Sequence, residues 1–236
     1  SLYACLHQLN TPEVNIATVE DPCEIQMPGI NQVNVQDKPG LGFAVALRAF
    51  LRQDPDILMV GEIRDLETAQ IAIQAAQTGH LVLSTLHTND APSTLVRLRN
   101  MGVASYNIAA SVSLITAQRL VRRLCKLCRE LAVVPSQVLK KAGLNTDTAE
   151  APEYRVYVPR GCSACHKGFR GRTGIFQVMP ISTAMQELIL QDASTLELDR
   201  QARLEGVRSL REAGLCKVLA GETSLDEVLA ATREQA

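Results

Sequence analysis

The sequence predicts an α/β protein built on a parallel β-sheet, and three observations lead to this fold class. Residues 57–60 form a short apolar run between charged and turn-forming residues, which is typical of a strand buried on both faces. A helical pattern at 65–78 and another apolar run at 80–85 follow, so strands and helices alternate. No apolar run in the 236 residues approaches the length of a membrane span.

The elements expected before this strand begin with a helix at residues 1–10, where leucines recur at helical spacing. A short strand at 14–19 follows and ends before Pro22, which cannot continue a sheet ladder. The next helix has an apolar stripe on one side and carries Arg48 and Arg52, four residues apart, on another. The alternation of strand and helix therefore includes the first sixty residues.

Helix caps define the elements that come next. Asp65 is expected to cap a helix that Gly79 closes. Pro92 and Gly102 stand where the first turn and the end of another helix are expected. Residues 105–124 are predicted to form one longer helix, because apolar residues recur there at helical spacing.

The last third of the chain is predicted to be helical from residue 181 onward. Capping-box patterns begin at Ser194 and at Ser224. Residues 145–153 are polar and aperiodic, so we expect an exposed loop there.

Acidic and imidazole side chains follow three of the predicted strands. Glu20 and Asp21 follow the first strand, Glu62 follows the second and His87 the third. Because ligands bind beyond the carboxyl ends of parallel strands, these side chains are expected at one ligand site. Nucleotide hydrolysis uses such groups to orient water, hold Mg²⁺ and contact the terminal phosphate. Taken singly, each is equally explained as a solvated strand end, but together they favour a phosphate site.

Four of the seven cysteines form two close pairs, Cys125 with Cys128 and Cys162 with Cys165. Two residues between the members of a pair let one turn aim both thiolates at one ion, and two such turns complete a tetrahedral Zn²⁺ site. Four thiolates leave no open position, so the expected zinc is structural. The alternative is four unligated thiols.

A basic cluster lies beside the first cysteine pair, and it raises the possibility of a nucleic-acid-binding zinc ribbon. Its members are Arg119, Arg122, Arg123, Lys126 and Arg129. Aromatic residues make up only 3% of the chain and the net charge is -1, so stacking and phosphate attraction are weakly supplied. We therefore expect no nucleic-acid partner, and a solvated helix face or a subunit contact are the alternatives.

Three segments of the chain resemble the bacterial secretion ATPases. Residues 18–24 are similar to the aspartate box of that family, residues 48–65 to its arginine-bearing helix and atypical Walker B motif, and residues 78–89 to its histidine box. The resemblance covers essentially the whole chain. Type IV pilus assembly motors are the most similar branch, and type II secretion ATPases are the alternative. The pilus retraction branch lacks the four-cysteine module.

The resemblance implies a RecA-like P-loop NTPase core at residues 1–118, a zinc subdomain at 119–172 and a helical C-terminal subdomain at 173–236. It also implies roles for single residues. Glu62 would be the catalytic carboxylate, Glu20 would polarise water or hold Mg²⁺, and His87 would sense the γ-phosphate. The nucleotide-binding residues that it implies are Asp21, Arg48, Arg52 and Arg172. For Arg172, a structural salt bridge is an equally good explanation.

Two departures from the usual motifs affect these expectations. Gly61 stands where an ordinary Walker B motif has aspartate, which matches the variant of this family. The chain also contains no Gly-x-x-x-x-Gly-Lys-Ser/Thr motif. We therefore expect a fragment that lacks the first strand and the P-loop of the core and is inactive alone, with a non-catalytic oligomerisation or interaction role as the alternative.

The resemblance further implies cofactors, partners and a location. ATP, Mg²⁺ and Zn²⁺ are the expected cofactors. The expected assembly is a homo-hexamer that acts on an inner-membrane platform protein, so contact with the membrane would be indirect. The expected location is the cytoplasm, peripheral to the inner membrane.

Overall fold

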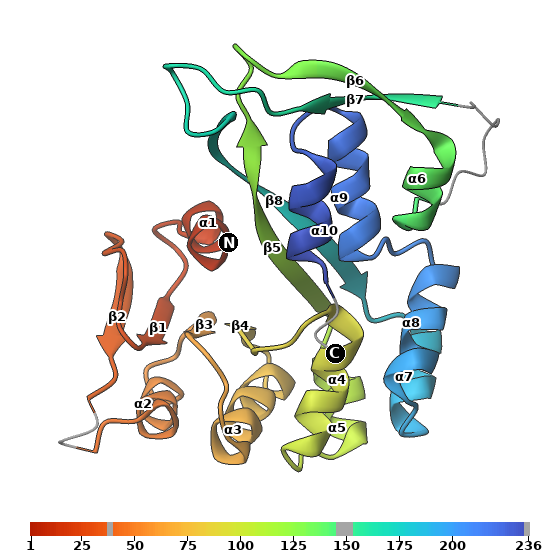
Figure 1. Cartoon of the computed structure of the whole chain (residues 1–236). Coiled ribbons are helices and arrows are strands. Elements are labelled where there is room, and N and C mark those ends of the chain that lie inside the picture. The colour runs from red at the N-terminus through yellow and green to blue at the C-terminus, as the bar shows by residue number, and fades with distance from the viewer. Residues whose placement is uncertain (37–39, 145–152, 234–236) are drawn as a thin grey trace. The chain divides into compact units, whose positions relative to one another are not determined.

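The computed structural model describes residues 1–36, 40–144 and 153–233, which fall into two compact units (Figure 1). The first, here called the sheet unit, comprises residues 1–88, 92–113 and 181–198. The second, here called the cysteine unit, comprises residues 89–91, 114–180 and 199–236. The loop expected at 145–153 lies outside the described residues except for Glu153.

The sheet unit is built on four parallel strands in the order β2-β1-β3-β4, which confirms the predicted α/β class. The strands are β1 (Ile16–Glu20), β2 (Ile30–Asn34), β3 (Ile57–Val60) and β4 (Leu81–Ser84). The sequence analysis did not predict β2, because that strand carries two apolar residues among polar ones. All five residues of β1 and all four of β3 are buried, as expected for the central strands of a covered sheet.

Helices cover both faces of this sheet, with α1 on one face and α2 and α3 on the other (Figure 1). The helices of the sheet unit are α1 (Leu2–Leu9), α2 (Phe43–Phe50), α3 (Leu66–Gln77), α4 (Ala91–Asn100, apart from Ala91), α5 (Ser105–Ser111), α7 (Thr183–Leu190) and the first residues of α8 (Thr195–Leu204). Successive strand residues point to opposite faces. Val19 and Leu58 therefore pack against the α2 side, while Ile16 and Met59 pack with Leu6 of α1.

The local signals of the sheet unit are confirmed where the structure describes them. The Thr68 N–H donates to the Asp65 side chain at 2.8 Å, so Asp65 caps α3 as predicted. Gly79 and Gly102 follow α3 and α4 with positive φ angles of 103° and 98°. Among the helices of the described residues, none combines the length and hydropathy needed to cross a bilayer.

The single helix predicted at residues 105–124 is wrong. Helix α5 ends at Ser111, and β5 (Leu114–Leu124) then pairs antiparallel with β8 (Phe169–Pro180). In β5, Ile115 and Ala117 are buried between more exposed neighbours, which is the period of a strand. Apolar residues in this stretch also fit helical spacing, so the local pattern was ambiguous and the pairing with β8 decides the structure.

The rest of the cysteine unit contains a second antiparallel pair and three helices. They are β6 (Glu130–Pro135), β7 (Glu153–Val158), α6 (Ser136–Lys141), α9 (Leu210–Leu219) and α10 (Leu225–Ala231), besides the end of α8. Leu139, Val156, Leu215 and Val228 form the centre of its core. Both β5 and β8 run across the expected boundaries at 118 and 172, so the compact units divide the chain differently from the three predicted parts, and the three-part division stays a prediction.

The predicted caps near the C-terminus have mixed outcomes. Ser194 and Glu197 exchange both hydrogen bonds of a capping box. Ser224 caps α10, but the Glu227 side chain bonds Arg122 in place of the cap. A complete capping box at Ser209, which the sequence analysis did not identify, begins α9.

Candidate functional site

The carboxyl edge of the parallel sheet brings Glu62 and His87 together. Glu62 follows β3 and His87 follows β4, and these neighbouring strands end at the same edge. The His87 Nε2 lies 3.2 Å from the Glu62 Oε2. The His87 side chain is 89% exposed and that of Glu62 is 16% exposed, so an anion arriving at this edge would meet the imidazole first.

Arg64 links this pair to Asp21. Its guanidinium donates to the second carboxylate oxygen of Glu62 and lies 3.5 Å from the Asp21 carboxylate. The hydrogen bond from Arg64 lowers the pKa of the Glu62 carboxyl below its usual value, although burial opposes the shift and His87 assists it. Glu62 is therefore an anion at neutral pH, in the state needed to accept a proton or attract a cation.

Glu20 lies at the same edge but in a different environment, because it is only 4% exposed. Its Oε1 accepts hydrogen bonds from the Thr18 hydroxyl at 2.6 Å and from the Gln32 side chain at 3.1 Å. The Tyr3 hydroxyl of α1 donates to its Oε2. Glu20 is thus held by three side-chain donors, which makes the buried carboxylate part of the framework of the edge.

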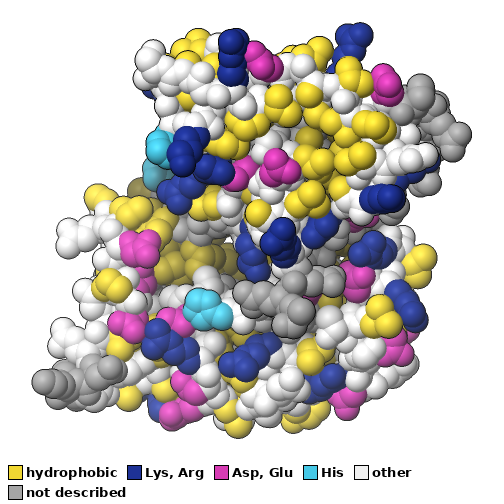
Figure 2. Space-filling view, in the orientation of Figure 1, with side chains coloured by type: hydrophobic (Ala, Val, Ile, Leu, Met, Phe, Trp, Pro, Cys, Tyr) yellow, Lys and Arg dark blue, Asp and Glu magenta, His cyan; other side chains and the backbone are white. Residues whose placement is uncertain are grey.

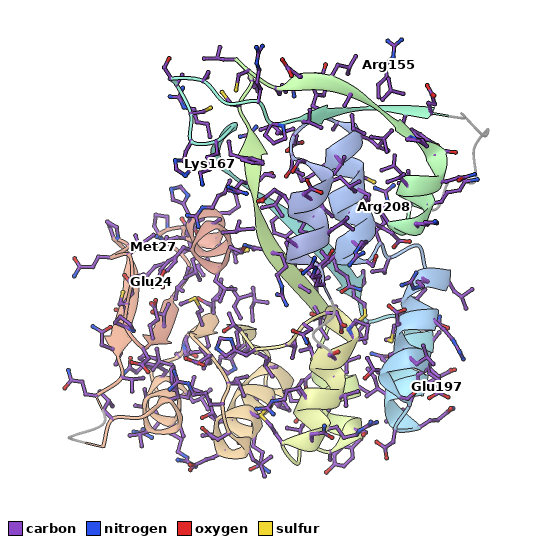
Figure 3. All side chains as sticks on the ribbon, viewed as in Figure 1. Glu24, Met27, Arg155, Lys167, Glu197 and Arg208 are labelled. Carbon is purple, nitrogen blue, oxygen red and sulfur yellow. The ribbon has the colours of Figure 1, made fainter. Side chains whose placement is uncertain are left out.

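Tyr3 also holds the segment that links β1 to β2. The N–H groups of Glu24 and Ile25 lie 3.0 and 3.4 Å from its hydroxyl oxygen, and Figure 3 shows Glu24 and Met27 beside α1. Burial, followed by the hydrogen bond to Glu20, raises the pKa of Tyr3 to about 12. The phenol therefore keeps its proton and remains a donor to Glu20.

Gly61 lets the turn after β3 approach the end of β1. A Cβ atom at this position would lie 3.2 Å from the Val19 carbonyl oxygen and 3.3 Å from the Glu20 Cα. The Gly61 N–H donates to the same Val19 oxygen at 2.8 Å. An aspartate here would crowd both strands, which is a physical reason for glycine at a position where ordinary Walker B motifs have an acid.

The arginines of the α2 region contact other groups. Arg48 pairs with Glu67 of α3 at 2.6 Å, and Arg52 donates to the Arg48 carbonyl at 3.0 Å. In the part of the chain that the structure describes, neither is thus paired with Glu62. Arg172 lies in β8 of the cysteine unit, in register with Arg122 of β5. Arg48 and Arg52 thus belong to the sheet unit and Arg172 to the cysteine unit, and their contacts with a nucleotide stay predictions.

The structure brings all four predicted zinc ligands together. The sulfur atoms of Cys125, Cys128, Cys162 and Cys165 all lie within 4.8 Å of one another. Cys165 Sγ is 3.7 Å from that of Cys128 and 3.6 Å from that of Cys162. A tetrahedral zinc with Zn–S bonds of about 2.3 Å requires sulfur atoms about 3.8 Å apart, so the residues fit a structural zinc.

Backbone contacts position the two cysteine turns. The Cys125 N–H donates to the Gly168 carbonyl at 2.9 Å, which ties the first pair to the turn after the second. Gly168 has a φ angle of 87°, and a Cβ there would lie 2.5 Å from the Pro159 Cβ. Only glycine fits this position without moving the turn.

Two of the four thiols have shifted pKa values. Burial raises the pKa of Cys128 to about 12; a backbone hydrogen bond from Gly161 opposes this shift and a hydrogen bond with Cys165 assists it. Burial also opposes ionisation of Cys165, but hydrogen bonds, the first from the backbone of Cys162, outweigh it and lower the pKa to about 7. Cys165 therefore loses its proton more readily than Cys128, and the thiolate is the form that binds metal.

Residues that the sequence analysis missed complete the picture of the sheet edge. Arg64 had a signal, because it stands two residues after Glu62 in the same motif. Tyr3 had a weaker one: residues 16, 18 and 20 share one face of β1, and that face turns toward α1. In the view of Figure 2, positive and negative side chains are interspersed, which does not favour a surface for a large polyanion.

The fold and site define a class of protein, an α/β chain with charged residues at the carboxyl edge of a parallel sheet and a separate four-cysteine cluster. Residues 1–230 match the family described as Type II/IV secretion system protein, and the chain belongs to that family. The resemblance found in the sequence is thus confirmed.

Curated relatives match almost the whole chain. The chain is 55% identical over 234 residues to the type IV pilus assembly ATPase PilB of Acinetobacter baylyi, covering 99% of this chain and 40% of that protein. It is 47% identical over 235 residues to type II secretion system protein E of Aeromonas hydrophila, covering 99% of this chain and 46% of that protein. The chain therefore spans less than half the length of these two relatives.

Solved structures show the same fold. The pilus retraction motor PilT with bound ADP superposes with a TM-score of 0.71 at 24% identity, covering 99% of this chain and 57% of that chain. The ATPase DotB of Legionella pneumophila superposes with a TM-score of 0.64 at 20% identity, covering 97% of this chain and 55% of that chain. At these identities the likeness concerns the fold alone.

Proposed function

We propose that this chain is the C-terminal motor region of an ATPase that drives type IV pilus assembly. The observation that carries the proposal is the contact of Glu62 with His87 and Arg64 at the carboxyl edge of a parallel sheet, in a member of this family. A carboxylate kept ionised by an arginine, beside an exposed imidazole, can activate water next to a terminal phosphate.

In this proposal, each acidic or imidazole side chain at the sheet edge has its own role. Glu62 orients or deprotonates the attacking water, and His87 reports on the γ-phosphate. Asp21, half-exposed and near Arg64, helps to hold Mg²⁺ when the nucleotide is bound. Glu20 accepts three hydrogen bonds, so it would polarise water or contribute to the Mg²⁺ site through its remaining acceptor capacity or after Tyr3 or Gln32 releases it.

The arginines would complete the site around the nucleotide. Arg48 and Arg52, and Arg172 of the cysteine unit, are proposed to reach a nucleotide in the same or a neighbouring subunit of a homo-hexamer. For Arg48 this requires release of Glu67, an exposed ion pair that contributes little stability and is easily exchanged. A nucleotide shared between subunits would couple hydrolysis to subunit packing.

The cofactors follow from the two sites. ATP and Mg²⁺ belong to the sheet edge, and Zn²⁺ held by the four cysteines is structural. Because the 236 residues contain no Gly-x-x-x-x-Gly-Lys-Ser/Thr motif, we expect negligible hydrolysis by this chain alone. A RecA-like P-loop core is accordingly a proposal for the full-length protein. Without hydrolysis, the chain alone would be an interaction or oligomerisation fragment.

A type II secretion ATPase is the second candidate, supported by the relative of that name at 47% identity. Pilus assembly is favoured because the pilus ATPases of Acinetobacter baylyi and Pseudomonas aeruginosa are 55% and 52% identical. In either case the proposed partner is an inner-membrane platform protein, and the proposed location is the cytoplasmic side of that membrane. No nucleic acid is a proposed partner.

Glu62→Gln in the full-length protein tests the proposal. The change keeps the shape of the side chain but removes the charge, so we expect the ATP hydrolysis rate to fall at least about 100-fold. Glu187→Gln, on an exposed position of α7, is the matched control and should hydrolyse ATP like the unchanged protein. Unchanged hydrolysis in the Glu62 variant would refute the motor assignment.

A second experiment separates the two candidate functions. The full-length protein is expressed in a deletion strain, and restoration of pili or of secretion shows which function it has.

A further inference from the structure

The structure separates the five members of the basic cluster into two groups. Three have partners within the cysteine unit: Arg119 donates to the Asn89 carbonyl at 3.2 Å, and Arg122 pairs with Glu227 at 2.6 Å. Arg129 donates to the Gly221 carbonyl at 2.5 Å and stacks on the Tyr157 ring at 4.2 Å. These contacts give structural roles to Arg119 and Arg122 and fix the direction of Arg129.

The other two members, Arg123 and Lys126, line a hollow together with Arg129. The hollow has a volume of about 340 Å³. Leu124, Ala220, Gly221 and Glu222 form the rest of its wall. Arg123 and Lys126 are exposed, so three cationic residues line one open depression.

The hollow keeps an excess of positive charge. Glu222 is the one acid of its lining, and it accepts hydrogen bonds from Lys217 at 2.9 Å and from Thr173 at 3.2 Å. The hydrogen bond from Lys217 lowers the pKa of the Glu222 carboxyl, although burial opposes the shift. The positive charges of Lys217 and, more weakly, of Arg123 also lower this pKa. The lining nevertheless carries three cations against one carboxylate, so its net charge is positive.

The backbone of the hollow's wall is fixed at two places. The Leu124 N–H donates to the Glu222 carbonyl at 2.9 Å, which joins the end of β5 to the segment after α9. Lys126 lies between two members of the cysteine cluster, Cys125 and Cys128. Because the backbone of the wall is fixed before any ligand binds, an anion would lose little affinity to reordering of the backbone.

We propose that this hollow binds a phosphate-bearing anion through Arg123, Lys126 and Arg129. Its polar wall and its size suit one or two phosphate groups, and arginine and lysine are the side chains that recognise them. The proposal concerns the cysteine unit alone and does not depend on nucleotide hydrolysis at the sheet edge.

Calorimetric titration of the zinc-loaded chain with inorganic pyrophosphate at low salt tests the free-anion source. We expect one saturable site that weakens at least about tenfold in each of Arg123→Ala and Lys126→Ala, since a charge-assisted hydrogen bond contributes on the order of 1.5 kcal/mol or more. Lys126→Arg should bind like the unchanged chain. Arg155→Ala is the matched control, because Arg155 points away from β7 (Figure 3).

Co-sedimentation with vesicles that contain phosphatidylglycerol tests the other source, a lipid headgroup. Binding in either arm that is lost in the two alanine variants and kept in the Arg155 variant supports the site. The proposal is overturned if the unchanged chain binds in neither arm, or if the alanine variants and the control bind alike. Zinc content and circular dichroism of each variant show whether it is folded, and a result at this hollow leaves the Glu62 experiment unaffected.

Discussion

The sheet unit and the cysteine unit are held together in different ways. In the sheet unit, β1 and β3 are buried on both faces by helices whose caps are encoded locally. The cysteine unit instead contains two-stranded ribbons that each leave one face open, as Leu120 of β5 and Leu131 of β6, 51% and 53% exposed, show. Because isolated two-stranded ribbons are marginally stable, this unit depends on long-range links such as the cysteine cluster.

Removal of zinc should therefore have the largest effect on stability. We expect this effect to be confined to the cysteine unit. We expect Cys128→Ser to bind well under one zinc per chain and to destabilise the cysteine unit by about 5 kcal/mol or more, since metal binding contributes directly to the stability of small metal-held folds. Hydrogen exchange should accelerate in β5, β6, β7 and β8 and stay slow in β1 and β3. Chelation of zinc from the unchanged chain should reproduce this result.

Cys216→Ser is the control for this experiment, because Cys216 is exposed and lies outside the cluster. It should retain zinc and slow exchange. The prediction that zinc stabilises the cysteine unit is wrong if the unchanged chain holds no zinc. It is also wrong if removal of zinc leaves hydrogen exchange in β5, β6, β7 and β8 unaltered.

A cavity in the sheet should have the next largest effect, on the other unit. Leu58→Ala in β3 removes a fully buried side chain between helices and sheet, so we expect a loss of about 2–5 kcal/mol in the free energy of unfolding. Zinc binding should be retained. Leu120→Ala, at a half-exposed position of β5, is the control and should cost less than about 1 kcal/mol. Equal losses in the two variants would contradict the burial-based account of the sheet.

The same difference explains how much of the fold the sequence could predict. The strand β3 and the helix capped by Asp65 are encoded within a few residues, and both were predicted. By contrast, β5 was predicted as helix, because its partner β8 lies on the far side of the cysteine segment and no local pattern records that pairing. The strands β2 and β7 were missed because polar residues interrupt their apolar positions. Strand β6 was also missed, although residues 131–134 are an uninterrupted apolar run, and its partner β7 lies beyond the intervening helix α6.

The candidate site shows the same limit on a smaller scale. Parallel strands place Glu62 and His87 at one edge, so their proximity followed from topology alone. The cysteine spacing likewise predicted the cluster. Arg64 and Tyr3 were missed because their contacts with Glu62 and Glu20 depend on the turn after β3 and on the face of β1 that α1 covers, which spacing does not specify.

Removal of a helix cap should have a smaller effect that is alike in both units. Asp65→Ala in the sheet unit and Ser209→Ala in the cysteine unit each remove a side chain that accepts an N–H of the first helical turn. We expect each to lower the free energy of unfolding by about 1 kcal/mol in thermal or denaturant unfolding. A far larger loss at Ser209 would show that the cysteine unit depends on its helices more than on its metal.

Loss of the ion pair between β5 and α10 should have the smallest effect on stability. The pH dependence of this loss distinguishes a specific link between the two elements from an ordinary surface ion pair. Arg122 of β5 bonds Glu227 of α10, and this hydrogen bond lowers the pKa of Glu227 although burial opposes the shift. A carboxyl with a lowered folded-state pKa adds stability above its unfolded pKa of about 4.3, and that stability is lost as the pH falls through the lower folded value. Glu227→Gln should therefore destabilise the chain slightly at pH 7 and not at all at strongly acidic pH.

Glu130→Gln is the control, because Glu130 and its partner Arg160 are both exposed. This variant should be as stable as the unchanged chain at either pH. If the two variants lose equal stability at pH 7 in matched denaturant titrations, the pair at Glu227 is an ordinary surface contact and the junction of β5 with α10 relies on packing alone.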